Sequence, residues 1–89
     1  MIRVFVWAKN LLNSSGQISV GGVQTYLCEL KRVLEHKGFT VTLIAAYAGQ
    51  NFEQDELIAV PFKEWEMGRK SKVLAERCGF QKNEVHIIG

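Results

Sequence analysis

The chain has 89 residues, of which 47% are hydrophobic and 22% are charged, a balance that fits one small globular domain and excludes a disordered chain. Its formal net charge of +2 is too small to indicate a nucleic-acid-binding protein, and no run of about 18 apolar residues indicates a membrane-spanning helix. No signal-peptide pattern is visible, and the widely separated Cys28 and Cys78 favour free thiols over a disulfide or a zinc site. We therefore expect a cytoplasmic protein without a metal or another cofactor.

The first half of the chain predicts a strand, a helix and a second strand. Residues 2–7 have the pattern of a buried strand, and a long polar loop follows at residues 8–20. The spacing of apolar residues predicts a helix over residues 23–37, ended by Gly38, and a second strand over residues 39–46. The predicted buried face of this helix consists of Val23, Tyr26, Leu27, Leu30, Val33 and Leu34. This order predicts parallel strands joined by a right-handed crossover.

The second half continues the alternation. After a polar loop at residues 47–55, the pattern predicts a short strand at 56–61, a helix at 63–78 and a last strand at 84–88. Gly68 weakens this helix by roughly 1 kcal/mol relative to alanine. The fold class is thus α/β, with a parallel sheet of about four strands and two helices. Because two helices cannot cover both faces of such a sheet, we expect exposed apolar surface, an open edge and a longer polypeptide.

Two consecutive glycines, Gly21 and Gly22, precede the first predicted helix directly after the long loop. Glycine lets backbone N–H groups approach a ligand closely, and a helix start adds unpaired donors and a positive dipole end. This combination favours an anion, such as the phosphate of a nucleotide or nucleotide-sugar. Together with Gly16 the pair does not form the dinucleotide-binding pattern G-x-G-x-x-G, and no Walker A motif occurs.

The sequence GGVQTYL at residues 21–27, the turn at Gly38 and the Thr/Val-rich strand that follows carry a family resemblance. Residues 83–89 add an acidic residue before an apolar strand that contains histidine. In these features the chain resembles the N-terminus of a retaining glycosyltransferase of the GT-B fold. The closest group is the class called glycosyl transferases group 1, which contains the phosphatidylinositol mannosyltransferases.

The resemblance implies transfer of a sugar from a nucleotide-diphosphate donor to a glycan or lipid-linked acceptor, with retention. Residues 1–89 would form an incomplete N-terminal Rossmann-like domain, and a second, C-terminal domain is missing from them. By motif, Gly21 and Gly22 would lie on the donor phosphate side and Gln24 would contact the acceptor, which Lys9 and Asn10 could border. The resemblance places no catalytic residue in this chain, so we expect the 89 residues alone to be inactive.

Other interpretations are open from the sequence. The chain could be a small nucleotide- or phosphate-binding module without catalysis, or the remnant of a broken gene. The glycine pair could serve a turn that needs a positive φ, and Gln24 could be a solvated residue of the first helical turn. His86, inside an apolar strand, is predicted to be a packed core residue rather than a catalyst.

The segment 62–72 combines aromatic and basic side chains and has two interpretations. It could dock at the inner face of a membrane, as a peripheral protein does. Alternatively, it packs Trp65 inward and leaves its charges in water. Glu64 and Glu66 reduce its basic character.

Overall fold

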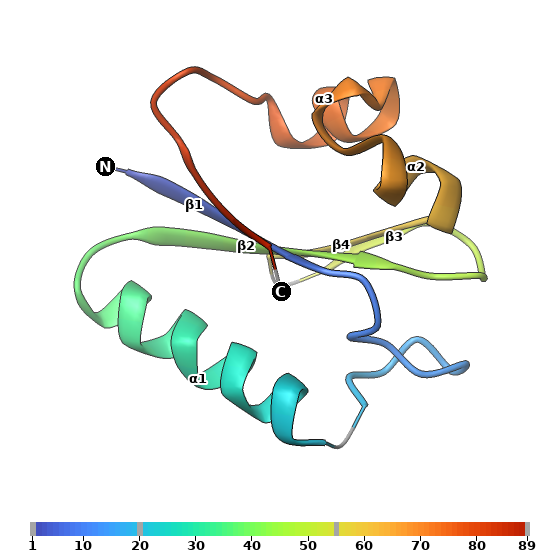
Figure 1. Ribbon diagram of the computed structural model, residues 1–89, viewed down its shortest axis with the longest axis horizontal. Coiled ribbons are helices and arrows are strands. Elements are labelled where there is room, and N and C mark those ends of the chain that lie inside the picture. The colour runs from blue at the N-terminus through green and yellow to red at the C-terminus, as the bar shows by residue number, and fades with distance from the viewer. Residues whose placement is uncertain (1, 20, 55, 89) are drawn as a thin grey trace.

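The computed structural model describes residues 2–19, 21–54 and 56–88, and of Val23 it describes only the backbone. In this part of the chain a sheet lies between helices, with α1 (Gly22–His36) on one face and α2 (Phe62–Met67) and α3 (Lys72–Cys78) on the other (Figure 1). The elements in chain order are β1 (Arg3–Ala8), α1 (Gly22–His36), β2 (Thr40–Ala46), β3 (Phe52–Gln54), β4 (Leu57–Val60), α2 (Phe62–Met67), the 3-10 helix η1 (Gly68–Lys70), α3 (Lys72–Cys78) and β5 (Val85–Ile88).

The sheet confirms the α/β class but corrects the prediction of a purely parallel sheet. Among the described residues it has five strands in the order β3-β4-β2-β1-β5, and β3 runs antiparallel to β4. The other neighbours are parallel, and they correspond to the four predicted strands. The sequence did not reveal β3, because a strand of three residues is too short to show an alternating pattern.

A second correction concerns the predicted helix over residues 63–78, which is interrupted. Gly68 adopts a φ of 60° and ends α2, and α3 begins after Ser71. The Ser71 hydroxyl accepts a hydrogen bond from the Leu74 N–H at 3.1 Å, which makes Ser71 the N-cap of α3. The left-handed conformation predicted at Gly38 is present, with a φ of 95°, and Gly79 caps α3 in the same conformation, with a φ of 58°.

Each face of the sheet carries its own apolar cluster, because successive side chains of a strand point to opposite faces. Along β1, Val4 and Val6 contact the α1 side, whereas Phe5 and Trp7 contact the α2 and α3 side. All four are buried, as expected for a strand covered on both faces.

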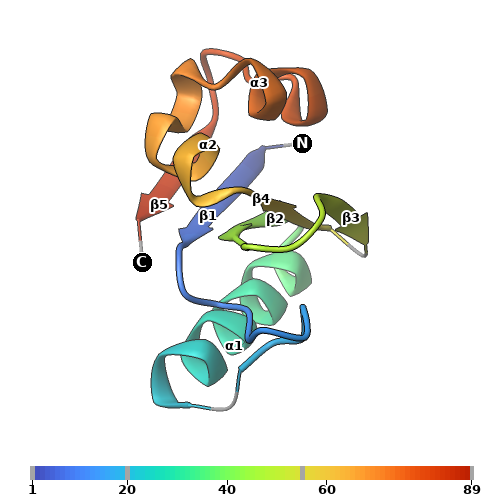
Figure 2. The same cartoon turned by 90° about the vertical axis from the view of Figure 1, so that its right-hand side faces the viewer.

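Two residues of the predicted buried face of α1 are exposed, which makes that prediction wrong for them. Tyr26 is 65% exposed and Val33 is 48% exposed, whereas Leu27 is buried and Leu34 packs against the core. The side chain of Val23 lies outside the described residues. Figure 2 shows α1 beneath the sheet, on the face opposite α2 and α3. Exposed apolar residues also occur on β5, at Val85 and Ile88.

Candidate functional site

The carboxyl ends of the parallel strands define the edge where a ligand is most expected. After β1, the parallel strands β2 and β4 are added on one side of β1. The chain then crosses back, and β5 pairs with β1 on its other side. In open α/β sheets, ligands bind outside the carboxyl ends of the strands where the order reverses in this way. The loop that leads to Gly21 and Gly22 leaves the sheet at this edge, after Ala8 (Figure 1).

The backbone at the glycine pair does not require glycine. Gly21 has an extended conformation (φ 171°), and neither Gly21 nor Gly22 is among the residues with positive φ. The interpretation of a turn that needs positive φ is therefore wrong. Apart from its two chain neighbours and the backbone of its own helix, a Cβ on Gly22 would meet no described heavy atom within 4 Å, so open space lies beside this residue. Glycine at this position leaves room for a group that approaches the backbone from outside.

The start of α1 has the features of an anion site. No side chain caps it among the described residues, and its first turn contains no acidic residue. The first i to i−4 hydrogen bond of the helix runs from the Thr25 N–H to the Gly21 carbonyl, at 3.0 Å. The backbone N–H groups of residues 22–24 lie before this bond, in the first turn of the helix. Unpaired N–H groups and the positive end of the helix dipole favour a negatively charged group here.

Gln24 ties the helix start to the preceding loop. Its side-chain amide donates to the Asn10 carbonyl at 3.3 Å. Its Oε1 lies so close to Gly21 that a Cβ there would be 2.5 Å away. The three predicted binding residues therefore lie together in the structure. The side chain of Gln24 lies over Gly21, whereas Gly22 is not covered.

The polar loop predicted at residues 8–20 has internal order in its described part, residues 9–19. Leu12 and Ile18 form an antiparallel bridge, and the Asn13 N–H donates to the Gln17 carbonyl at 2.8 Å. The Asn13 carboxamide oxygen also accepts from the Ser15 and Gln17 N–H groups. The loop is thus a compact hairpin beside the helix start.

A second concave feature lies at the same edge and was not predicted. We call it the tryptophan pocket. It is lined by Trp7 of β1, His86 of β5, Trp65 and Glu66 of α2, and Arg69 of η1, and its volume is about 260 Å³. Trp65 packs inward as one interpretation of segment 62–72 predicted. No sequence pattern marks this pocket, because the sheet order alone brings β5 beside β1.

The two indoles of the pocket have satisfied N–H groups. Trp7 Nε1 donates to His86 Nδ1 at 3.0 Å, and Trp65 Nε1 donates to the Ile44 carbonyl at 3.0 Å. Their rings are 6.1 Å apart and inclined by 75°. The aromatic wall therefore offers carbon surface, and Glu66 and Arg69 supply the charged groups.

His86 has a structural role here, as predicted. Its Nδ1 accepts a hydrogen bond from the Trp7 indole N–H, so the neutral ring carries its own proton on Nε2. The ring stacks on Phe5 with centroids 5.2 Å apart. Burial lowers the pKa of His86, and the positive charge of Arg69 adds to this effect. A neutral, stacked imidazole is expected at pH 7.

Two consecutive residues connect the helix start with the tryptophan pocket. Lys9 Nζ lies 2.6 Å from Glu66 Oε1 in an ion pair, and the next residue, Asn10, accepts from Gln24. The segment expected from the resemblance to border the acceptor therefore runs from one feature to the other.

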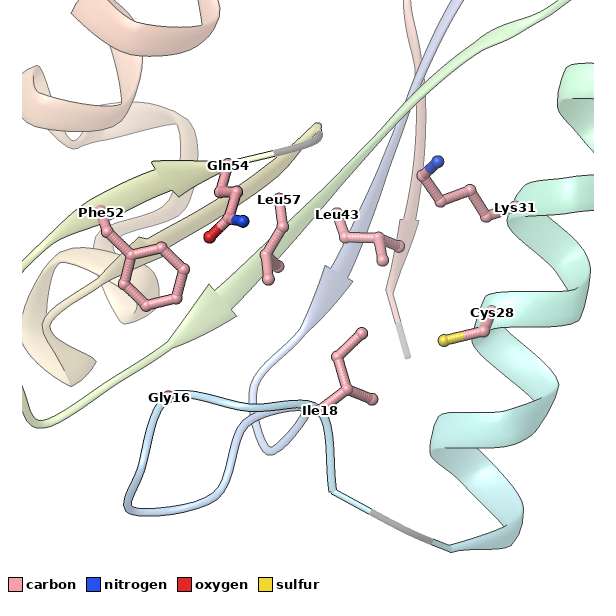
Figure 3. A pocket seen from close by; sticks show the side chains of 8 residues that line it. All are labelled: Gly16, Ile18, Cys28, Lys31, Leu43, Phe52, Gln54 and Leu57. Carbon is pink, nitrogen blue, oxygen red and sulfur yellow. The ribbon is translucent and has the colours of Figure 1, made fainter.

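Another cavity, of about 280 Å³, opens on the α1 face between the loop, α1 and the strands β2, β3 and β4 (Figure 3). Ile18, Leu43 and Leu57 give it an apolar lining, and the Cys28 sulfur points toward it. Lys31 also lines it, but its ammonium pairs with Glu35 and Glu56 at 2.9 and 3.1 Å. Burial alone would lower the pKa of Lys31, but the hydrogen bonds to the two carboxylates outweigh it and raise this pKa.

Within the described ranges, no group of three or more His, Cys, Asp or Glu residues could hold a metal ion. The helices of the same ranges are too short or too polar to cross a bilayer. Comparisons of the chain with protein families, with curated proteins and with solved structures found no match.

Proposed function

We propose that this chain is the N-terminal, Rossmann-like part of a retaining glycosyltransferase of the GT-B fold. In this proposal the start of α1 faces the diphosphate of a nucleotide-sugar donor, and the neighbouring loop and pocket face a glycan or lipid-linked acceptor. The observation that carries the proposal is the open backbone at Gly22. Its conformation suits any residue, yet the position is left without a side chain beside an uncapped helix start.

The physical role of the glycine pair would be electrostatic. A nucleotide-diphosphate leaving group gains negative charge as the bond to the sugar breaks. Preorganised N–H groups and a helix dipole stabilise such a developing charge without reorganising. A Cβ at Gly22 would project into the space that the phosphate needs, while leaving the helix intact.

No catalytic residue is assigned within these 89 residues. The described carboxylates at the edge are engaged elsewhere, since Glu66 pairs with Lys9 and Glu64 accepts from Ser71. In the proposal, donor recognition and the transfer step depend on a C-terminal domain. The chain alone supplies one wall of the site.

The test is a titration of the isotope-labelled chain with uridine diphosphate and with inorganic pyrophosphate, read from backbone amide resonances. We expect the amides of Gly21, Gly22 and Gln24 to shift. The Gly22→Ala variant should bind more weakly although its urea midpoint is unchanged or higher, because alanine favours a helix by up to about 1 kcal/mol over glycine. Thr25→Ala is the matched control, since it raises helix propensity in the same turn without adding an atom at Gly22.

The outcomes separate the proposal from the alternatives. The proposal is supported if uridine diphosphate shifts these amides, and if its binding is weaker in Gly22→Ala but unchanged in Thr25→Ala. Equal binding of inorganic pyrophosphate and uridine diphosphate would favour a phosphate-binding module. Amides of residues 21–24 that do not respond to any of these anions would refute the phosphate role.

A further inference from the structure

The tryptophan pocket has a composition that points to an uncharged ring with hydroxyl groups. Its apolar wall is formed by the two indoles and Ile88, and the indoles present carbon surface because both indole N–H groups are already bonded. Its charged groups are of opposite sign, with the Glu66 carboxylate on α2 and the Arg69 guanidinium on η1. A pocket of this kind, apolar with a few placed polar groups, is typical of small-molecule sites.

The charges of the pocket argue against ionic ligands. A phosphate would face the Glu66 carboxylate, and a quaternary ammonium would face the Arg69 guanidinium. Glu66 already pairs with Lys9, and Arg69 donates to the Gln81 carbonyl at 3.3 Å. Both side chains retain further hydrogen-bonding capacity, which hydroxyl groups can use as donors and acceptors.

The size and shape of the pocket restrict the ligand further. Its volume of about 260 Å³ lies just below the usual range of ligand pockets and suits a single ring better than a whole nucleoside. The Trp7 and Trp65 rings form a corner of 75° rather than a parallel slot. A flat base that stacks on one indole would meet the edge of the other, whereas a puckered ring presents C–H groups to both.

We propose that the tryptophan pocket binds one hexopyranose ring, with its C–H face against the indoles and its hydroxyl groups on Glu66 and Arg69. The assignment of this ring to the acceptor rests on the proposed function. The binding of a hexopyranose in the pocket is independent of the proposed function. The Lys9–Glu66 ion pair and the Gln24–Asn10 hydrogen bond place the pocket next to the helix start along the chain.

The experiment uses the indole N–H resonances, of which the chain has two because it contains two tryptophans. The chain is titrated with methyl α-glucopyranoside, methyl α-mannopyranoside and methyl α-galactopyranoside, and separately with uridine. At least one glycoside should shift both indole resonances at millimolar concentration, and uridine should shift neither. The Trp65→Phe variant assigns the two signals.

Paired variants test the contact that gives specificity. Arg69→Gln should weaken glycoside binding about tenfold, as expected for loss of a hydrogen bond to a charged group. Lys70→Gln removes one positive charge from the adjacent exposed residue, which does not line the pocket, and should leave binding unchanged. Matching urea midpoints would show that both variants fold normally.

Three results would overturn the inference: indole signals that respond to no glycoside, a response to uridine, or equal losses in Arg69→Gln and Lys70→Gln. Each is independent of the diphosphate test, which is read at residues 21–24. Silent indoles with responsive glycine amides would remove the hexopyranose and leave the proposed function. The reverse result would remove the diphosphate role and leave a carbohydrate-binding pocket.

Discussion

The two faces of the sheet are closed in different ways. On the α2 and α3 face, the aromatic rings of Phe5, Trp7 and Phe80 pack within 6 Å of one another in successive pairs. Partly buried hydrogen bonds also tie the helices to the sheet there, such as the one from Trp65 Nε1 to the Ile44 carbonyl. On the α1 face a single helix, among those described, lies on the strands and leaves Tyr26 and Val33 exposed.

This difference indicates where stability and where binding are concentrated. The α2 and α3 face carries the large side chains whose burial contributes most to folding. The α1 face contributes less per residue, but its helix start lies open at the carboxyl edge of the sheet. The tryptophan pocket is the exception, since it combines the aromatic packing of the first face with access from that edge.

The largest expected effect is truncation in the aromatic cluster. Phe5 is 1% exposed and contacts Phe80 and His86, so Phe5→Ala should destabilise the chain by about 3–5 kcal/mol. The corresponding change on the other face, Val33→Ala, should cost less than about 0.5 kcal/mol because Val33 is 48% exposed. Urea unfolding of both variants measures the contrast, and similar losses would show that the α1 face is as tightly packed.

A smaller loss is expected at the break between η1 and α3. Ser71 is fully buried, caps α3 and donates to Glu64 Oε2 at 2.6 Å. Ser71→Ala removes the cap and leaves the carboxylate without this donor, so we expect a loss of about 2 kcal/mol, at the upper end for caps. Ser71→Thr keeps the hydroxyl and serves as the matched control. If alanine and threonine gave the same midpoint, the hydroxyl would have no capping role.

The stability of the aromatic cluster should also depend on pH through His86. Its pKa is lowered from 6.5 in the folded chain, so below pH 6.5 the unfolded chain takes up the proton first. Stability should therefore fall as the pH decreases from 6.5 toward the lowered pKa of the folded state. Carboxylates with lowered pKa, such as Glu66, lose their contribution only below 4.5, which separates the two windows.

The measurement is the urea midpoint between pH 7.5 and 5, with the range chosen around the ordinary histidine pKa. His86→Gln keeps an acceptor for Trp7 and should flatten the profile, whereas His36→Gln, at an exposed position on α1, should not. If the pH dependence of the urea midpoint flattened only in His36→Gln, the pH-dependent stability would originate on the α1 face and not at His86.

The sequence predicted the elements that have long apolar patterns and missed those set by short or distant contacts. The four parallel strands and α1 followed from periodicity, and the glycine caps followed from composition. Gly68 and Ser71 could have predicted the break between α2 and α3, since both are standard helix-end residues. Tyr26 and Val33 were misplaced because periodicity identifies an apolar stripe but not what covers it.

The two parts of the candidate site differ in the same respect. Gly21, Gly22 and Gln24 are neighbours in sequence, so a local motif could indicate them. Trp7, Trp65 and His86 are brought together only by the order of the strands, with β5 beside β1. No local pattern carries that information, and the pocket required the structure.

The smallest expected effect concerns the ion pairs that join α1 to the edge of the sheet. Glu56 has a φ of 65° and pairs with Lys31 at 3.1 Å. The left-handed conformation costs roughly 1–2 kcal/mol for a residue with a Cβ, so glycine would relieve strain at this position. Glycine would also lose the partly exposed ion pair, worth about 0–1 kcal/mol, and would add chain entropy of about 0.5–1 kcal/mol to the unfolded state.

These opposing contributions predict that Glu56→Gly changes the free energy of unfolding by less than about 1 kcal/mol. A double-mutant cycle with Lys31→Gln isolates the ion pair, and its coupling energy should be less than about 1 kcal/mol. A coupling above about 2 kcal/mol would show that the α1 face depends on charge pairs more than on packing. The contrast between the faces would then be one of chemistry, with aromatic contacts on one side and ion pairs on the other.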